Sequence, residues 1–312
     1  MCRCPINTFA GTEQTMTRNR NIVPFKGLNQ LQDLVQRIDE VKEVPVYFTD
    51  INGDYAEIQR SKGVVNARNG HYIATVSNRY SIFQNKSLLQ SITSVCEENS
   101  FEPWGKVTAE PTRFAIDCIF PEFGAITDNS PQGINMGAKL TNSYDKSWIA
   151  AGFGFLYRLI CKNGMYAKSM MPELQFSQRH VGVNDGNPSK IIEGFDRFVR
   201  MIEPAKEVIG DYIHEAMDPP VKFQNLDQIA ATLGAMIGSM KAGNYMVNAL
   251  DNKENLSPSK YDLYNAVTAF ATHSGLSMKR EHDISRMGEI LLQPETVIVP
   301  LTDEQLQVMI PA

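Results

Sequence analysis

Apolar and polar residues alternate along much of the first half of the chain, and this pattern predicts strands. In residues 113–120 every second residue is apolar, and residues 134–140 repeat the pattern. Successive side chains of a strand point to opposite faces, so both segments are expected to be half-buried antiparallel strands. Further strands are predicted at residues 71–77 and 148–159, with a hairpin turn at Asn163 and Gly164. Together these strands predict a meander.

Beyond residue 186 the apolar residues recur at intervals of three and four, which predicts helices. Pro204 is expected to kink or break the first of them, and the last is expected over residues 284–292. Two shorter helices are predicted near residues 28–41 and 85–98. The predicted starts of the later helices are N-cap residues, some followed by proline: Asn187 with Pro188, Asn225 with Gln228 three residues on, and Ser257 with Pro258.

These patterns predict an α+β fold with an antiparallel-sheet-rich N-terminal half and a helical C-terminal half. Residues 1–27 are polar and lack sustained periodicity, so they are expected to form a flexible arm. Residues 28–180 are expected to be the sheet-rich region, and residues 181–312 a helical region packed on it.

Composition favours a soluble protein of the cytoplasm. The chain has 43% hydrophobic and 21% charged residues, which is enough to build a core, and no apolar run is long enough to span a membrane. The first thirty residues lack the apolar stretch of a signal peptide. The five cysteines are scattered, which is not typical of a disulfide framework and favours a reducing compartment.

Charge is distributed unevenly along the chain, although the net charge is only −5. Residues 181–312 hold eighteen acidic and eleven basic residues, whereas residues 139–180 are locally basic. A local basic surface is what electrostatic binding of an anion requires. The bases of this stretch are Lys139, Lys146, Arg158, Lys162, Lys168 and Arg179.

Residues 139–168 are the most informative stretch for function, because aromatic residues are interleaved with these basic residues. Exposed aromatics that stack on bases, beside cations that contact phosphates, are typical of single-stranded nucleic-acid binding. The alternative is that the aromatic face is core, and for Phe153 and Phe155 core is favoured. Tyr144 and Trp148 are the better candidates for contact.

Arg79 is a second candidate, because it lies at a predicted turn between strand and helix. Its guanidinium is suited to bidentate contact with a phosphate, and equally to pairing with a carboxylate. Tyr80 follows it. The two possibilities for Arg79 are left open by the sequence.

Motifs for catalysis and metal binding were not found. The chain has no Walker loop, and Gly152 and Gly154 lack the third glycine of a dinucleotide fingerprint, so they are expected to relieve crowding on a strand. Cys2 and Cys4 have no second cysteine pair to complete a zinc site. Glu40 and Lys42 have the spacing found in many nucleases but lack the preceding Pro-Asp strand. We therefore expect no cofactor, no metal and no enzymatic activity.

Several segments together resemble a family of phage and plasmid proteins catalogued as domain of unknown function 932. The matching segments are Tyr72 to Tyr80 followed by a helix from Asn85, Thr141 to Asp145, Arg158 to Met165, and Tyr261 to His273. The resemblance implies a bacteriophage protein made in the cytoplasm of a bacterial host. More distantly, the layout of sheet and helices looks like that of phage single-strand annealing proteins, which implies homo-oligomers.

The leading hypothesis is a non-enzymatic phage protein that binds and anneals single-stranded DNA in support of recombination or replication. Host or phage replication proteins are possible partners, and no membrane is expected. An alternative is a phage module that engages a host protein through its acidic helical half, and a third is an unrecognised nuclease. The residues predicted to contact nucleic acid are Arg79, Tyr80, Lys139, Tyr144, Lys146, Trp148, Arg158, Lys162 and Lys168.

Overall fold

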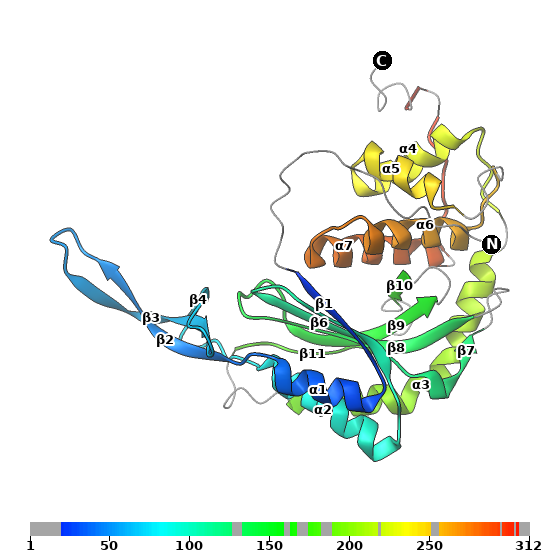
Figure 1. Cartoon of the computed structure of the whole chain (residues 1–312). Coiled ribbons are helices and arrows are strands. Elements are labelled where there is room, and N and C mark those ends of the chain that lie inside the picture. Colours follow the sequence, from blue (N-terminus) through cyan, green and yellow to red (C-terminus); the bar gives the residue numbers. More distant parts are fainter. Residues whose placement is uncertain are drawn as a thin grey trace. The chain divides into compact units, whose positions relative to one another are not determined.

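The chain has the predicted α+β fold, with strands in its first half and helices in its second (Figure 1). Our computed structural model describes residues 20–126, 133–158, 163–166, 174–181, 189–217, 220–250, 256–293, 295–302 and 304–305. These residues divide into two compact units. The sheet unit covers Arg20–Leu159 and Tyr166–Val208, and the helical unit holds the described residues of Ile160–Met165 and Ile209–Ala312. The division falls within a helix, whereas the sequence suggested a boundary at residue 180.

The larger sheet is an antiparallel meander, as the alternating pattern predicts. Its successive neighbours are β5 (Trp104–Ala109), β6 (Arg113–Ile119), β8 (Ile134–Ser143) and β9 (Ala150–Arg158). Shorter strands join it, with β1 (Asn21–Lys26) beside β5, β7 (Ala125–Ile126) beside β8 and β11 (Phe176–Gln178) beside β9. The strand β10 (Asn163–Tyr166) begins at the two residues that were expected to form a turn.

One face of this sheet is the core of the sheet unit. Phe114, Ile116, Cys118 and Phe120 lie on it and are almost fully buried. The other residues of β6 from Ala115 to Ile119 and every residue of β8 are buried as well, so the expectation of half-buried strands is wrong for this pair. Figure 1 shows α1 (Leu28–Arg37), α2 (Asn85–Asn99) and α3 (Ser189–Met217) on the same side of the sheet.

The strand β1 lies where the sequence suggested a flexible arm. It pairs with β5 from Asn21 opposite Ala109 to Lys26 opposite Trp104. Only Phe25 of this strand is buried, and Pro24 is tolerated because β1 is an edge strand. One buried side chain in six residues gives no detectable period, which is why this strand was missed. Residues 1–19 of the expected arm lie outside the described residues.

A smaller sheet precedes α2. It consists of β2 (Val41–Thr49), β3 (Tyr55–Asn66) and β4 (Tyr72–Ser77), in that order. β4 pairs only with the end of β3 near Ser61 to Val65. Beyond that point β2 and β3 continue as a two-stranded ribbon, whose residues 47–57 we call the hairpin arm (Figure 1).

The helices of the second half begin at capping residues. Asn225 accepts a hydrogen bond from the N–H of Gln228, as predicted, and starts α4. Ser259 forms a capping box with Asp262 and starts α6, so this helix begins after Ser257, the expected start. The bounds of the helices that follow α3 are Leu226–Ile237 for α4, Met240–Asn248 for α5, Lys260–His273 for α6 and Met278–Glu289 for α7, followed by a short 3₁₀ turn at Ile290–Leu292.

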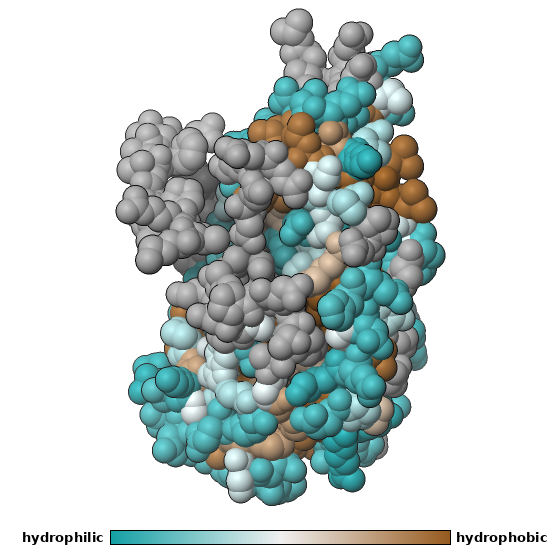
Figure 2. Space-filling view, turned by 90° about the vertical axis from the view of Figure 1, so that its right-hand side faces the viewer, coloured by the Kyte–Doolittle hydropathy of each residue, from teal (hydrophilic) through white to brown (hydrophobic). Residues whose placement is uncertain are grey.

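The helix α3 continues through Pro204 instead of breaking there. The expected start of this helix at Asn187 and Pro188 lies outside the described residues. None of the helices in the described ranges is long and apolar enough to cross a membrane. On the face shown in Figure 2, hydrophilic residues make up most of the described surface, and hydrophobic residues form smaller groups between them.

Candidate binding surfaces

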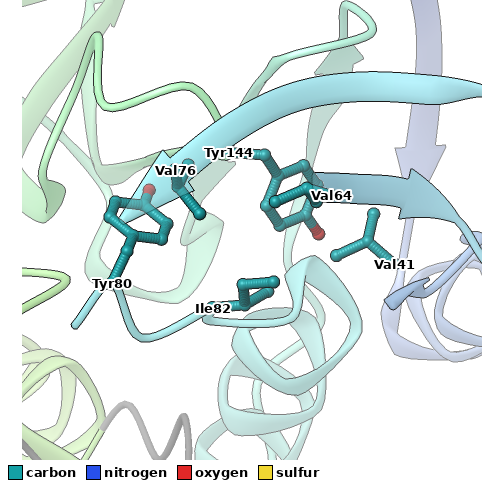
Figure 3. Packing of buried hydrophobic residues seen from close by; sticks show 6 residues of the cluster. All are labelled: Val41, Val64, Val76, Tyr80, Ile82 and Tyr144. Carbon is teal, nitrogen blue, oxygen red and sulfur yellow. The ribbon is translucent and has the colours of Figure 1, made fainter. Parts of the chain in front are cut away.

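Tyr80 and Tyr144 belong to a buried cluster that joins the smaller sheet to the body of the sheet unit (Figure 3). They are only 3% and 4% exposed, so neither offers a ring face to a nucleotide base. Their predicted role as stacking platforms is therefore not supported by their positions. Their partners in the cluster are aliphatic residues from three strands and the following loop: Val41, Val64, Val76 and Ile82.

The two tyrosine hydroxyls are used inside the protein. Tyr80 Oη donates to the carbonyl of Ser143 at 2.8 Å, and Tyr144 Oη accepts the N–H of Asn85 at 3.1 Å. Burial raises the pKa of both hydroxyls well above the usual value, which keeps both of them protonated. These bonds tie the end of β8 to the segment between β4 and α2.

His180 stacks on Tyr80 and fixes the segment after β11. The two rings are 4.7 Å apart and nearly parallel, and Phe83 lies 4.6 Å away from His180 on a tilted plane. His180 Nδ1 donates to the carbonyl of Ser81 at 3.0 Å, and the backbone of Val181 pairs with that of Tyr80. Residues 180 and 181 are thereby held against residues 80 and 81.

The loop between β8 and β9 is closed by internal hydrogen bonds and exposes Lys146. Ser143 Oγ donates to the carbonyl of Trp148 and accepts its N–H, each at 3.0 Å. Asp145 accepts the N–H of Ser147 at 2.9 Å. Lys146 is exposed and has a left-handed φ of 67°, which costs a non-glycine residue about 1–2 kcal/mol. A strained residue held by its neighbours is a pointer to function.

Arg113 braces this loop from β6. Its Nε donates to Ser147 Oγ at 3.0 Å, and its guanidinium lies 3.8 Å from Asp145 and 5.9 Å from the ring centroid of Trp148. Trp148 is half-buried and already has a cation near its ring. The predicted stacking of a base on Trp148 would have to use the remaining exposed part of the ring.

Lys139 is an internal ion-pair partner, so its predicted phosphate contact is not supported. Its Nζ lies 2.9 Å from Asp117, and Lys106 lies 3.5 Å from the other oxygen of that carboxylate. Burial would raise the pKa of Asp117, but the charges of the two lysines outweigh burial and lower it. The ammonium of Lys139 is therefore neutralised within the sheet.

The remaining predicted contacts in this stretch are described only in part. Arg158 is the last residue of β9, but its side chain lies outside the described residues, as do Lys162 and Lys168 altogether. Phe153 is 2% exposed and lies in the core, as favoured from the sequence, whereas the side chain of Phe155 is not described. Gly152 relieves crowding, since a Cβ there would lie 2.1 Å from the ring of Phe176.

Four exposed cations lie on chain segments that neighbour the Tyr80–His180 stack. Arg79 precedes Tyr80, and the N–H of Lys146 points to the Tyr80 hydroxyl. The carbonyl of Arg60 accepts the N–H of Asn78 at 3.2 Å, which places β3 beside this turn. Arg60, Arg79, Lys146 and Arg179 are all exposed, and none of these four forms an ion pair with another described residue. We call this set the cationic cluster: Arg60, Arg79, Lys146 and Arg179.

Arg60 and Arg179 were not predicted as contact residues. Arg60 lies in β3, and its backbone hydrogen bond with Asn78 brings it near Arg79. Arg179 directly follows β11, and the stacking of the next residue, His180, on Tyr80 brings it near Arg79 as well. The only sequence signal was that Arg179 belongs to the locally basic stretch. For Arg79, no ion pair with a carboxylate is seen among the described residues, and its contact with phosphate stays a prediction.

The nuclease-like pair Glu40 and Lys42 lies after the end of α1 and at the start of β2, and Glu40 has a basic partner. Glu40 pairs with Lys86 at 3.2 Å, and Lys42 lies on β2 opposite Val65. Within the described ranges, no group of three or more His, Cys, Asp or Glu side chains could hold a metal ion. Comparison with known protein families, curated proteins and solved structures finds no match for this chain. The family resemblance therefore stays a prediction from the sequence.

Proposed function

We propose that the chain is a non-enzymatic protein that binds the backbone of single-stranded DNA through the cationic cluster. The observation that carries this proposal is the presence of four exposed cations, without ion-pair partners in the described chain, on segments that neighbour the Tyr80–His180 stack. Arginine suits bidentate contact with phosphate, because its planar guanidinium presents several N–H donors in a fixed geometry. A role in phage recombination or replication, suggested by the family resemblance, is part of the same proposal.

The structure changes the expected mode of binding. Because Tyr80 and Tyr144 are buried, contacts to phosphates supply most of the affinity, and the exposed part of Trp148 is the aromatic surface that remains. Phosphate contacts carry little sequence information. Binding is therefore expected to tolerate any base sequence and to weaken as salt rises.

A filter-binding titration with labelled single strands at several salt concentrations tests this function. Arg79→Ala and Lys146→Ala should each weaken binding and reduce the slope of log K against log salt by about 0.7, the value for one phosphate contact on a single strand. Arg37→Ala, at the exposed end of α1, is the matched control and should leave both unchanged. An annealing assay with complementary strands then tests the more specific activity.

No binding at low salt would refute the proposal, and so would binding that the cluster substitutions leave intact. The alternative, engagement of a host protein through the acidic helical half, predicts a stoichiometric protein partner that survives nuclease treatment in a pull-down. The titration separates the two, because the alternative requires no affinity for DNA.

A further inference from the structure

The hairpin arm exposes large apolar side chains that none of the described residues covers. Tyr47 and Phe48 are about half exposed, Tyr55 is 81% exposed, and Ile51 at the turn is 100% exposed. Tyr47 pairs with Glu57 and Phe48 with Ala56, so Tyr47 and Phe48 lie on opposite faces of the ribbon. A two-stranded ribbon with apolar residues on both faces is marginally stable in water by itself. This surface is typical of one that a partner covers.

The arm is nevertheless well formed at its tip. The carboxylate of Asp50 accepts the N–H groups of Asn52 and Asp54 at 2.8 and 2.9 Å, and Gly53 supplies the positive φ of 91° that the turn needs. Ile51 is therefore held outward at a position where polar residues are usual. An arm that is already ordered loses little conformational entropy when it docks.

Charge restricts what the arm can bind. Residues 47–57 contain three acids, Asp50, Asp54 and Glu57, and no basic residue. A nucleic-acid backbone is repelled by this charge, and so is the arm of another copy. The surface that fits the arm is therefore apolar and positively charged.

The sheet unit carries such a surface at the cationic cluster. Ile149 and Val181 are 47% and 57% exposed there, beside the four cations. Gln178 lies opposite Ala150, which places Arg179 next to Ile149, and Val181 pairs with Tyr80. Four positive charges and two exposed aliphatic side chains are complementary to an arm with three acids and exposed apolar residues.

We propose that the hairpin arm of one copy docks on the cationic cluster of a second copy. We propose the head-to-tail form of this contact, which leaves one arm and one cluster open at the ends of each pair. Repetition of such a contact builds a ring or a filament. The proposal shares residues with the proposed DNA contact but does not depend on it, since assembly requires no DNA. If both hold, DNA and the arm compete for the same cations.

Sedimentation of the full chain without nucleic acid tests the contact. The wild-type protein should form species larger than its 34.9 kDa monomer, and more of them at low salt. An arm variant, Phe48→Ser with Ile51→Ser, and a cluster variant, Arg79→Glu with Lys146→Glu, should each weaken association at least about tenfold. The arm variant leaves Asp50 in place, so the turn is preserved, and circular dichroism checks that both variants fold.

Mixing the two variants distinguishes a head-to-tail contact from other assemblies. The arm variant keeps an intact cluster and the cluster variant an intact arm, so the mixture should form a one-to-one dimer and nothing larger. A wild-type protein that stays monomeric at every concentration would overturn the proposal. Assembly that persists in either variant, or a mixture that forms no dimer while wild type assembles, would overturn it as well. Because no DNA is present, none of these results bears on the proposed DNA binding.

Discussion

The side-chain amide of Gln84 forms two hydrogen bonds with the backbone of Val41, as the backbone of a neighbouring strand would. Its nitrogen donates to the carbonyl of Val41 at 2.8 Å, and its oxygen accepts the N–H of Val41 at 3.0 Å. Gln84 is also the N-cap residue of α2, and its side chain makes no capping bond because it is engaged with β2. This contact fastens the start of the smaller sheet, and with it the hairpin arm, to the helix.

Replacing Gln84 with alanine should loosen this attachment. Two part-buried hydrogen bonds are lost, so the free energy of unfolding is expected to fall by about 1–3 kcal/mol. Chemical denaturation measures this change, and hydrogen exchange at the Val41 amide should accelerate. Gln90→Ala, at an exposed position of the same helix, is the matched control and should change stability by less than about 0.5 kcal/mol. An unchanged exchange rate at Val41 would contradict the attachment.

Lys146 is expected to favour binding at the expense of stability. Glycine adopts a φ of 67° without strain, so Lys146→Gly should leave the free energy of unfolding unchanged or raise it by up to about 1 kcal/mol. Lys146→Ala keeps the strain and should be less stable than the glycine variant. Both should weaken DNA binding to a similar extent, because both remove the ammonium. Equal stabilities of the two variants would argue against backbone strain at this loop.

The backbone of the main sheet could be predicted because its signal is local. In residues 113–120 and 134–140 every second residue is apolar, and β5, β6, β8 and β9 lie beside one another in chain order, so the period and the order together predict the meander. Asn225 could be identified as a cap because the bond it accepts comes from Gln228, three residues on. β1 could not be found, because an edge strand with one buried residue carries no period.

The candidate surface was harder to predict because it depends on long-range pairing. Tyr144 follows a strand and lies in a polar loop, yet it points into a cluster whose other members come from residues 41–82. Lys139 looked like an exposed base until the register of β6 and β8 placed Asp117 opposite it. Composition can identify the basic residues of a stretch, but the register of the strands determines which of them lie opposite an acidic residue.

Phe176 is wedged between β9 and α3, and this packing requires glycine on both sides. A Cβ at Gly194 would lie 2.3 Å from Cγ of Phe176, and one at Gly152 would lie 2.1 Å from its ring. Gly194→Ala should therefore lower the free energy of unfolding by about 1–3 kcal/mol through overpacking. Denaturant unfolding of Gly194→Ala, Phe176→Ala and the double variant measures the coupling. If the clash with Phe176 is the cause, the double variant should be more stable than the sum of the two single changes predicts. Strict additivity of the two changes would exclude this clash as the cause.

His180 should make stability depend on pH below neutrality. Burial lowers its pKa below the usual 6.5, although its bond to Ser81 acts in the opposite direction, and its buried Nε2 has no hydrogen-bond partner among the described residues. As pH falls through about 6.5, the unfolded chain takes up a proton that the folded chain resists, so stability declines until the folded pKa is reached. The loss cannot exceed about 1.4 kcal/mol per pH unit for one group.

Unfolding curves of the wild type and of His180→Gln between pH 7.5 and about 5 isolate this contribution, since every other titrating group is common to both proteins. The difference in unfolding free energy should be constant above about pH 7 and shrink as pH falls. The carboxylates with lowered pKa, Asp117 and Asp145, lose their contribution only below about pH 4, outside this window. Because His180 holds Arg179 beside Tyr80, the same fall in pH should loosen one side of the cationic cluster. Parallel pH curves for the two proteins would show that His180 does not titrate between pH 7.5 and about 5.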